Sequence, residues 1–251
     1  MMSPTFSIII PAHNEEHNIG TLLETIAKQS YRDFEVIVSD SDSQDETCKV
    51  IEGFRRTLPA LVLLEEITQN VAAARNNGAK YAKGEYLVFF DADVFIEKHF
   101  FKEVIDHIEI DHPSMMTMWN RPTPPTFRGR IIFGIMNHLV QMAQNTHPAA
   151  NGPCIIMKRA LFESVEGFDQ TIFFGEDYDI VKRAHQKGGV MKVYKHPLFF
   201  VSTRRFEKEG LLVSLYKSIS ALVYQFLFGP VRKPIFEYEM GGQYYEHSNK
   251  K

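Results

Sequence analysis

The strongest constraint on the fold is the alternation, over residues 1–110, of short apolar runs with segments of helical periodicity. Four runs are expected to be strands, namely 6–10, 34–38, 61–64 and 86–90. Helices are predicted between them, at 18–29, 47–54 and 71–82. Strands that are apolar along their whole length, with helices between them, indicate an α/β fold with a mostly parallel sheet covered on both faces.

Polar, carboxylate-rich segments follow three of the predicted strands, at 11–16, 39–45 and 91–93. Right-handed crossovers bring the carboxyl ends of parallel strands to one edge of a sheet. Ligands bind at that edge in open α/β sheets. We therefore expect the three segments to converge on one site.

Asp91 and Asp93 lie two residues apart, directly after an apolar run. Two carboxylates so placed can reach one hard cation, such as Mg²⁺ or Mn²⁺, which usually shares its coordination sphere with substrate phosphates. The ordinary alternative is a pair of solvated loop carboxylates. Their position at the end of a buried strand favours the cation site.

Beyond residue 110 the pattern is weaker. A loop is predicted at 121–125, an amphipathic helix at 130–142, and a strand at 154–157 after a turn at 151–153. A further helix is expected to begin within 175–179 and to run to about residue 186.

The carboxylates Glu176 and Asp177 open this last helix. One interpretation is that they complement the positive end of the helix dipole. The other is that one of them is a general base, which removes a proton from an attacking hydroxyl. The residues alone favour the first interpretation.

The segment 211–228 is unusually apolar, with 13 apolar residues of 18. Basic residues lie on both sides of it: Arg204, Arg205, Lys208, Arg232 and Lys233. A broad apolar face with basic flanks is typical of a helix in a membrane interface. Packing on the core or on a second subunit explains the pattern equally well. We expect a domain over 1–200 and a C-terminal amphipathic extension over 201–251.

Composition limits the partners and the compartment. A net charge of −3 and a pI of about 6.4 give no sign of the basic surface that nucleic acid requires. Cys48 and Cys154 are far apart and form no thiolate zinc motif, which suits a reducing compartment. The first residues lack the basic and long apolar regions of a signal peptide. We expect a cytoplasmic location, peripheral on the membrane.

Several motifs in order make the chain resemble the inverting glycosyltransferases of family 2, which have the GT-A fold. The resemblance runs from Ser7 to Gly189. Its first motifs are the strand and loop at 7–16 and the segment 38–47, which is similar to D-G-G-S-T-D-G-T with Ser41 and Asp42 in place of glycines. The next are Ala74-Arg75-Asn76-Asn77-Gly78 and the G-E-Y strand with its D-x-D at 84–93. The last are Gly167-Phe168-Asp169 and the segment 175–179.

The resemblance implies a nucleotide-diphosphate sugar as donor, a UDP-sugar before a GDP-sugar, and a divalent metal, Mg²⁺ or Mn²⁺. It assigns donor-side roles to the residues that match the motifs. These are Pro11, Ala12 and Glu15 beside the base and ribose; Asp40 as the residue that recognises the base; Arg75 near the diphosphate; Asp91 and Ala92 at the nucleotide sugar; and Asp93, with Asp91, at the metal.

The resemblance also implies that Asp177 is the catalytic base, with Glu176 beside it, which reverses the preference for a helix-dipole role. Gly152 is placed near the acceptor. Arg204 lies beyond the matched region and is expected on the acceptor side, where it binds an acceptor or donor phosphate; the alternative is that it lies at a lipid surface.

The expected function is metal-dependent transfer of a sugar, with inversion, to a lipid-linked or cell-envelope glycan acceptor. Two alternatives stay open. One is a polyprenyl-phosphate glycosyltransferase, in which a lipid phosphate is the nucleophile. The other is a nucleotide-sugar-binding protein or membrane scaffold without catalysis.

Overall fold

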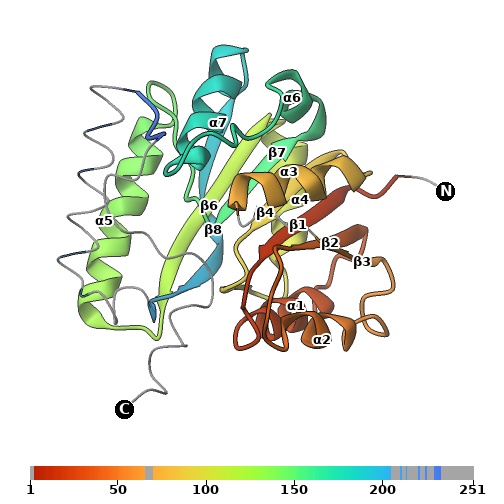
Figure 1. Ribbon diagram of the computed structural model, residues 1–251. Helices are drawn as coiled ribbons and strands as arrows, with labels where there is room; N and C mark the ends of the chain where they lie inside the picture. The colour runs from red at the N-terminus through yellow and green to blue at the C-terminus, as the bar shows by residue number, and fades with distance from the viewer. Residues whose placement is uncertain are drawn as a thin grey trace.

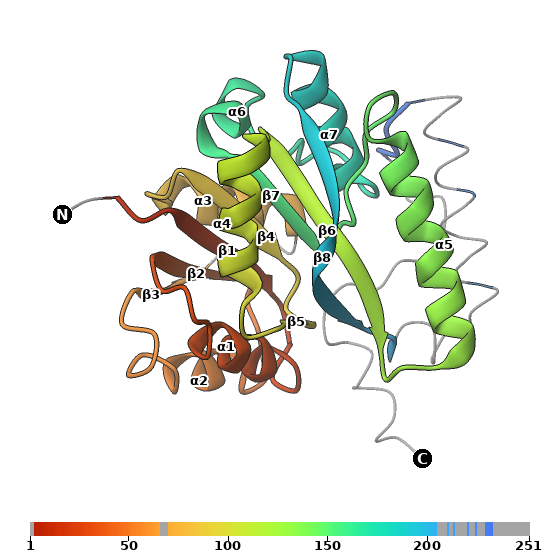
Figure 2. The same ribbon diagram turned by 180° about the vertical axis from the view of Figure 1, so that it is seen from behind.

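The computed structural model describes residues 3–65, 70–204, 210, 213, 220, 224 and 229–232. Within these ranges, one eight-stranded sheet lies between two layers of helices (Figures 1 and 2). The elements in chain order are β1 (Phe6–Ala12), α1 (Ile19–Ala27), β2 (Phe34–Asp40), α2 (Thr47–Glu52), β3 (Leu61–Glu65), α3 (Val71–Tyr81), β4 (Tyr86–Phe90), β5 (Val94–Ile96), α4 (Phe100–Asp111), β6 (Met115–Thr123), α5 (Phe127–Ala143), β7 (Cys154–Lys158), α6 (Arg159–Ser164), α7 (Glu176–Gln186) and β8 (Met191–Ser202).

The strand order across the sheet is β3-β2-β1-β4-β7-β6-β8-β5. The first four strands of the chain are mutually parallel, as predicted. Strand β7 runs antiparallel to both β4 and β6, and β5 runs antiparallel to β8. The predicted α/β class is therefore confirmed, with a sheet that is parallel on one side and mixed on the other.

Both faces of the sheet are covered, which explains the unbroken apolar runs. Ile8 and Ile10 of β1 pack in one core, with residues of α1, α2 and α4. Ile9, between them, packs in the second core, with residues of α3, α6 and α7. Successive side chains of a strand point to opposite faces, so a strand covered on both sides needs apolar residues at successive positions.

The predicted loop at 121–125 is wrong in its first half. Arg121, Pro122 and Thr123 continue β6 and pair with residues 200–202 of β8. The two prolines that follow, and Pro122 itself, gave the pattern of a loop. Strand β7 pairs with β6 only at Met115 and Met116, so the C-terminal end of β6, which includes Pro122, is hydrogen-bonded to β8 alone among the described strands. A proline, which has no N–H, is tolerated at such a position.

Helix α5 begins earlier than the predicted 130–142 segment. Thr126 precedes it, and its Oγ1 accepts a hydrogen bond of 3.0 Å from the Gly129 N–H. A threonine at this position satisfies one of the free donors of the first turn. The apolar periodicity that predicted the helix does not include the capping residue, so the start was placed too late.

The predicted extension at 201–251 is only partly described. The segment 211–228 lies outside the described residues, apart from isolated positions. Val231 forms a bridge with Phe174, and Arg232 pairs with Asp169 at 2.8 Å. In the described part of the chain, no helix has both the length and the apolar character that a membrane span requires.

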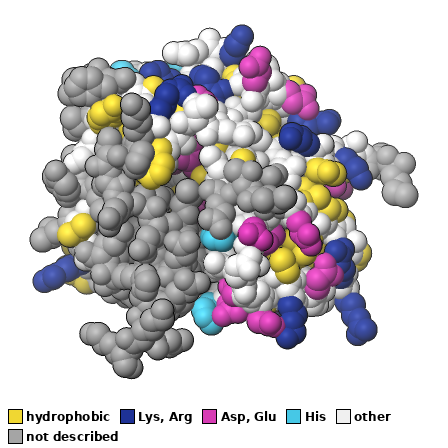
Figure 3. All heavy atoms as spheres, in the orientation of Figure 1, with side chains coloured by type: hydrophobic (Ala, Val, Ile, Leu, Met, Phe, Trp, Pro, Cys, Tyr) yellow, Lys and Arg dark blue, Asp and Glu magenta, His cyan; other side chains and the backbone are white. Residues whose placement is uncertain are grey.

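Figure 3 shows Asp and Glu side chains on the surface of the half of the molecule that holds α1 and α2.

The packing of α3 on β1 leaves no room for a side chain at Gly78. A Cβ at this position would lie 2.6 Å from Cγ2 of Ile9, which is fully buried. We expect Gly78→Ala to lower the free energy of unfolding by about 1–2 kcal/mol, because the cost of overpacking exceeds the gain in helix propensity. Urea denaturation measures this change.

Gly134 provides the matched control, since it is also helical but has nothing within 4 Å of its Cβ position. Gly134→Ala should raise the free energy of unfolding by up to about 1 kcal/mol. Equal effects of the two substitutions would contradict the tight packing of α3 on β1.

Candidate active site

The loops after β1 and β2 are joined by hydrogen bonds. The Ser41 N–H donates to the Ala12 carbonyl at 2.8 Å, and the Asn14 N–H donates to Ser43 Oγ at 2.8 Å. Strands β1 and β2 are in register, so Pro11 lies beside Ser39 and Ala12 beside Asp40. These contacts place three of the predicted donor-side residues together at one sheet edge.

Asp40 ends β2 with a carboxylate that is held in place. The backbone N–H and the hydroxyl of Ser43 donate to its two oxygens, at 3.0 and 2.5 Å. The residue is 3% exposed. Carboxylate oxygens accept more than one hydrogen bond each, so this group retains acceptor capacity at the edge of the sheet.

Arg204 connects the loop after β1 to the turn after β4. Its two Nη atoms bind both carboxylate oxygens of Glu15, at 2.8 and 2.5 Å, and its Nε lies 3.5 Å from Asp93 Oδ2. Glu15 is buried, and Asn18 also donates to it at 2.7 Å. Arg204 thus contacts two residues that were predicted for the donor side. All three carboxylate-rich segments are brought together.

Arg75 of α3 makes the second connection. It is buried, and its Nη atoms bind Asp91 Oδ1 at 2.7 Å and Glu176 Oε1 at 2.8 Å. Its guanidinium lies 5.2 Å from the centre of the Phe168 ring. Burial alone would lower the pKa of Arg75, but the nearby carboxylates, Asp91 first, raise it overall. The residue is therefore a permanent cation between β4 and α7.

Asp177, at the start of α7, has an unusual environment. Its Oδ1 accepts a hydrogen bond of 2.8 Å from the Tyr178 N–H. Its Oδ2 lies against Gly152, where an added Cβ would be only 2.3 Å away. Burial, and then the charge of Glu176, raise the pKa of Asp177 from 3.8 to about 7, while Arg75 opposes the rise. A carboxylate with this pKa can take up a proton near neutral pH.

Glu176 does not cap α7 with its side chain, since its carboxylate binds Arg75 instead. The helix begins after Gly175, which has a φ of +83°. A glycine reaches this left-handed conformation without a steric cost. The chain therefore turns sharply into α7, and the two carboxylates face the sheet edge.

A buried amide cluster, which the sequence analysis missed, supports Gly152. Asn151 Nδ2 donates to the Met118 carbonyl at 2.8 Å and to Asn137 Oδ1 at 3.1 Å. The Asn151 N–H lies 3.3 Å from Thr117 Oγ1, which accepts its hydrogen bond. One feature of the sequence points to this cluster: Asn137 interrupts the apolar pattern of the predicted 130–142 helix. The cluster fixes the turn that packs on Asp177.

The donor groups for a cation are the carboxylates of Asp91 and Asp93. Their side chains are 34% and 16% exposed. No cluster of three or more His, Cys, Asp or Glu side chains suited to a metal ion occurs among the residues that the structure describes. Five carboxylates (Glu15, Asp91, Asp93, Glu176 and Asp177) surround the two arginines, so negative charge is in excess. Two oxygen donors in such surroundings fit a hard cation that takes its other ligands from a substrate.

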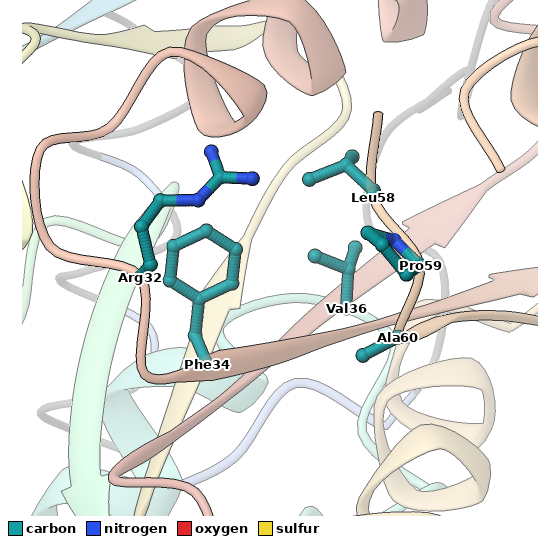
Figure 4. Close-up of a pocket in the computed structure, with 6 residues that line it drawn as sticks. All are labelled: Arg32, Phe34, Val36, Leu58, Pro59 and Ala60. Carbon is teal, nitrogen blue, oxygen red and sulfur yellow. The ribbon is translucent and has the colours of Figure 1, made fainter. Parts of the chain in front are cut away.

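A small pocket at the opposite edge of the sheet, where the parallel strands begin, is not part of this site (Figure 4). Phe34 and Val36, near the start of β2, line it, whereas Asp40 ends that strand. Its remaining lining residues are Arg32, Leu58, Pro59 and Ala60. Apart from Arg32, these side chains are apolar, so the pocket offers little to a charged nucleotide.

Comparisons with known proteins agree with this architecture. The model of glycosyl transferase family 2 matches residues 7–165. Over 114 residues the chain is 35% identical to a poly(ribitol-phosphate) beta-N-acetylglucosaminyltransferase, TarS, of Staphylococcus aureus, covering 44% of this chain and 20% of TarS. Over 88 residues it is 39% identical to an Escherichia coli UDP-Glc:alpha-D-GlcNAc-diphosphoundecaprenol beta-1,3-glucosyltransferase, WfgD, covering 35% of this chain and 34% of the relative. The chain thus spans about a third or less of the length of these two relatives.

Solved structures show the same fold. S. aureus TarS 1–349 in complex with UDP-GlcNAc superposes with a TM-score of 0.65 and 24% identity, over 80% of this chain and 59% of that chain. The mannosyltransferase PcManGT of Pyrobaculum calidifontis, in complex with GDP-Man and Mn²⁺, gives a TM-score of 0.68 and 23% identity, over 88% and 65% of the two chains. The GT-A fold that the resemblance implied is confirmed.

The raised pKa of Asp177 predicts a pH-dependent cost in stability. The ionised form is disfavoured in the folded state, so the cost is absent below about pH 4 and complete above the folded pKa of about 7. Asp177→Asn should therefore raise the free energy of unfolding at pH 8 by about 1–3 kcal/mol, and should bring no such gain at pH 4. Denaturant titrations at the two pH values measure the difference.

Asp106→Asn, at a half-exposed carboxylate of α4, is the control. It should show no comparable gain at pH 8. A gain for Asp177→Asn that is the same at both pH values would contradict the raised pKa of Asp177.

Proposed function

The chain belongs to glycosyl transferase family 2, and from that premise we propose that it transfers a sugar from a nucleoside diphosphate sugar to an acceptor hydroxyl, with inversion. The observation that carries the proposal is Asp177, a carboxylate with a pKa of about 7 that faces the same sheet edge as Asp40 and Asp91. A general base with a pKa near the working pH suits the removal of a hydroxyl proton.

The donor is proposed to lie along the ends of β1, β2 and β4. Pro11, Ala12 and Glu15 border the base and ribose, and the fixed carboxylate of Asp40 accepts N–H groups of the base. Ala92, between the two aspartates, lies beside the sugar nucleotide. A UDP-sugar is favoured, because the relative WfgD is named for UDP-Glc and two solved TarS structures are complexes with UDP-GlcNAc and with UDP. A GDP-sugar, as in PcManGT, is the second candidate.

A divalent cation, Mg²⁺ or Mn²⁺, is proposed to bind at Asp91 and Asp93. The two carboxylates and the excess of negative charge around them suit a hard cation. Bound there, the cation would supply neutralisation of the charge that develops on the leaving diphosphate. The solved neighbour PcManGT contains Mn²⁺, which supports a divalent cation as the cofactor but does not bear on which residues hold it.

The proposed reaction is a single displacement. Asp177 accepts the proton of the acceptor hydroxyl, and the hydroxyl oxygen forms a bond to the anomeric carbon of the donor. The bond from that carbon to the diphosphate oxygen breaks, and the nucleoside diphosphate leaves with the electron pair. Arg75 is a positioning residue, because it holds Glu176, beside the base, to Asp91.

The pKa of Asp177 favours a hydroxyl over a lipid phosphate as nucleophile. A phosphate is already ionised at neutral pH and needs no strong base, whereas a hydroxyl has to lose its proton during attack. We propose a lipid-linked or cell-envelope glycan as the acceptor, in view of the names of TarS and WfgD. Gly152, against the base, lies on the acceptor side. A cytoplasmic protein, peripheral on the membrane, with its catalytic domain at 1–200, fits this acceptor.

Asp93→Ala tests the cation site. We expect loss of the Mn²⁺-dependent part of nucleotide binding, because one of the two carboxylate ligands is removed. Calorimetry with UDP, GDP and dTDP, each with and without Mn²⁺, measures the binding. Asp177→Asn is the control and should bind nucleotide as the wild type does. Unchanged metal-dependent binding by Asp93→Ala would remove this residue from the metal site.

Gly152→Ala tests the role of Asp177 without changing the base itself. The added methyl group would lie 2.3 Å from Asp177 Oδ2 and must displace the carboxylate. We expect sugar transfer to fall by about 100-fold or more, in keeping with the contribution of a general base, while nucleotide binding is unchanged. Gly134→Ala, the same substitution in open space, should leave transfer unaltered. Full activity of Gly152→Ala would exclude Asp177 as the base.

A further inference from the structure

Helix α5 exposes much of its apolar surface and buries a polar residue, which is the opposite of an ordinary surface helix. The one buried residue among its 17 is Asn137. Phe127, Ile135, Leu139 and Met142 are 81%, 55%, 54% and 79% exposed, whereas Val140 packs against the core that contains α3, α6 and α7. Ile131, at 48%, completes the series. The spacings of three and four residues place all five on one stripe of the helix, which we call the outer stripe.

The inner side of α5 is held to the sheet by amide groups. Asn137 exchanges hydrogen bonds with the backbone of Asn120, at 2.9 and 3.2 Å. Gln141 donates to the Val193 carbonyl at 3.1 Å, and Gln144 accepts from the Val193 N–H at 2.8 Å. These bonds fix which way the helix faces. The exposure of the outer stripe is therefore a property of the fold and not of a loosely packed helix.

The charge around α5 is one-sided. Residues 112–162 contain no Asp or Glu, although the whole chain has 31 in 251 residues. Arg121, Arg128 and Arg130 are exposed at the N-terminal end of the helix. In Figure 3, hydrophobic side chains and some Lys or Arg side chains are visible on the side where α5 runs. An apolar stripe whose own stretch of sequence carries arginines and no acidic residue complements an anionic lipid surface.

We propose that the outer stripe of α5 docks on an anionic lipid bilayer. The apolar side chains enter the boundary between headgroups and acyl chains, and Arg128 and Arg130 contact lipid phosphates. The inner side of the same helix contacts Asn151, next to Gly152. Docking therefore brings the lipid surface to the acceptor side of the site, a consequence that rests on the proposed function.

A second copy of the chain fits this surface less well. In a twofold-symmetric contact, α5 would face its own counterpart. Because 112–162 contains no Asp or Glu, α5 of the second copy and the stretch around it would offer no carboxylate to these arginines. Such a contact leaves the arginines without anionic partners from the facing helix, whereas lipid phosphates pair with them.

Sedimentation of the full chain with vesicles tests the proposal. We expect binding to vesicles of phosphatidylglycerol and phosphatidylcholine, weaker binding at high salt, and little binding to phosphatidylcholine alone. The variant Ile131→Gln/Ile135→Gln/Leu139→Gln should lose at least tenfold in affinity. The variant Arg128→Glu/Arg130→Glu should lose a similar factor on the anionic vesicles. All five positions are exposed, so the substitutions leave the core untouched.

Ile110→Gln/Val190→Gln is the matched control, because these apolar residues are 75% and 51% exposed but lie outside α5. It should bind vesicles as the wild type does. Three results would overturn the proposal: no vesicle binding by the wild type, full binding by the triple variant, or a solution dimer that the triple variant dissociates. Vesicle binding needs no donor or turnover, and calorimetry of the triple variant reports nucleotide binding separately, so failure here is distinguishable from failure of the proposed transferase activity.

Discussion

The site depends on one buried ion-pair system around Arg75. A buried guanidinium is costly unless carboxylates surround it, and here it binds Asp91 at the end of β4 and Glu176 at the start of α7. The parallel half of the sheet supplies the first carboxylate, and the later, mixed half of the chain supplies the second. The cation thus fixes the distance between the donor edge and the helix that carries Asp177. Removing it would leave uncompensated carboxylates and separate the two halves of the site.

Asp177 is kept basic by a balance between that cation and its other surroundings. Burial and Glu176 raise its pKa, and Arg75 limits the rise to about 7. Gly152 packs directly against the Asp177 carboxylate, and the hydrogen bond between Asn151 and Asn137 holds the turn that contains this glycine. Helix α5 therefore supports the base with its inner amides. In the proposed arrangement, its outer stripe meets the lipid surface from which an acceptor would arrive.

The sequence predicts the parallel half of the fold well, because strands buried on both faces need unbroken apolar runs. Strands β1 to β4 and the helices between them were located within a few residues. The later strands were missed where the pattern is interrupted, as at Pro122 in β6 and at Lys195–Pro197 in β8. Arg75, Asp91 and Glu176 were each identified through motifs, but their ion pairs join residues 101 and 16 positions apart and have no local signature. The packing of Gly152 on Asp177 is equally invisible in the sequence, since it depends on the crossing of a turn and a helix.

In the proposed reaction, a carboxylate with a near-neutral pKa, Asp177, removes the proton of the acceptor hydroxyl. The most direct measurement is the pH dependence of sugar transfer by the wild-type protein, with the nucleotide sugar that calorimetry selects and saturating metal. We expect a rate that rises with pH and levels off above an apparent pKa of about 7, the pKa of Asp177. A rate that is already constant between pH 5 and pH 8 would contradict it, because the proton would then be removed by a group of ordinary acidity or by none.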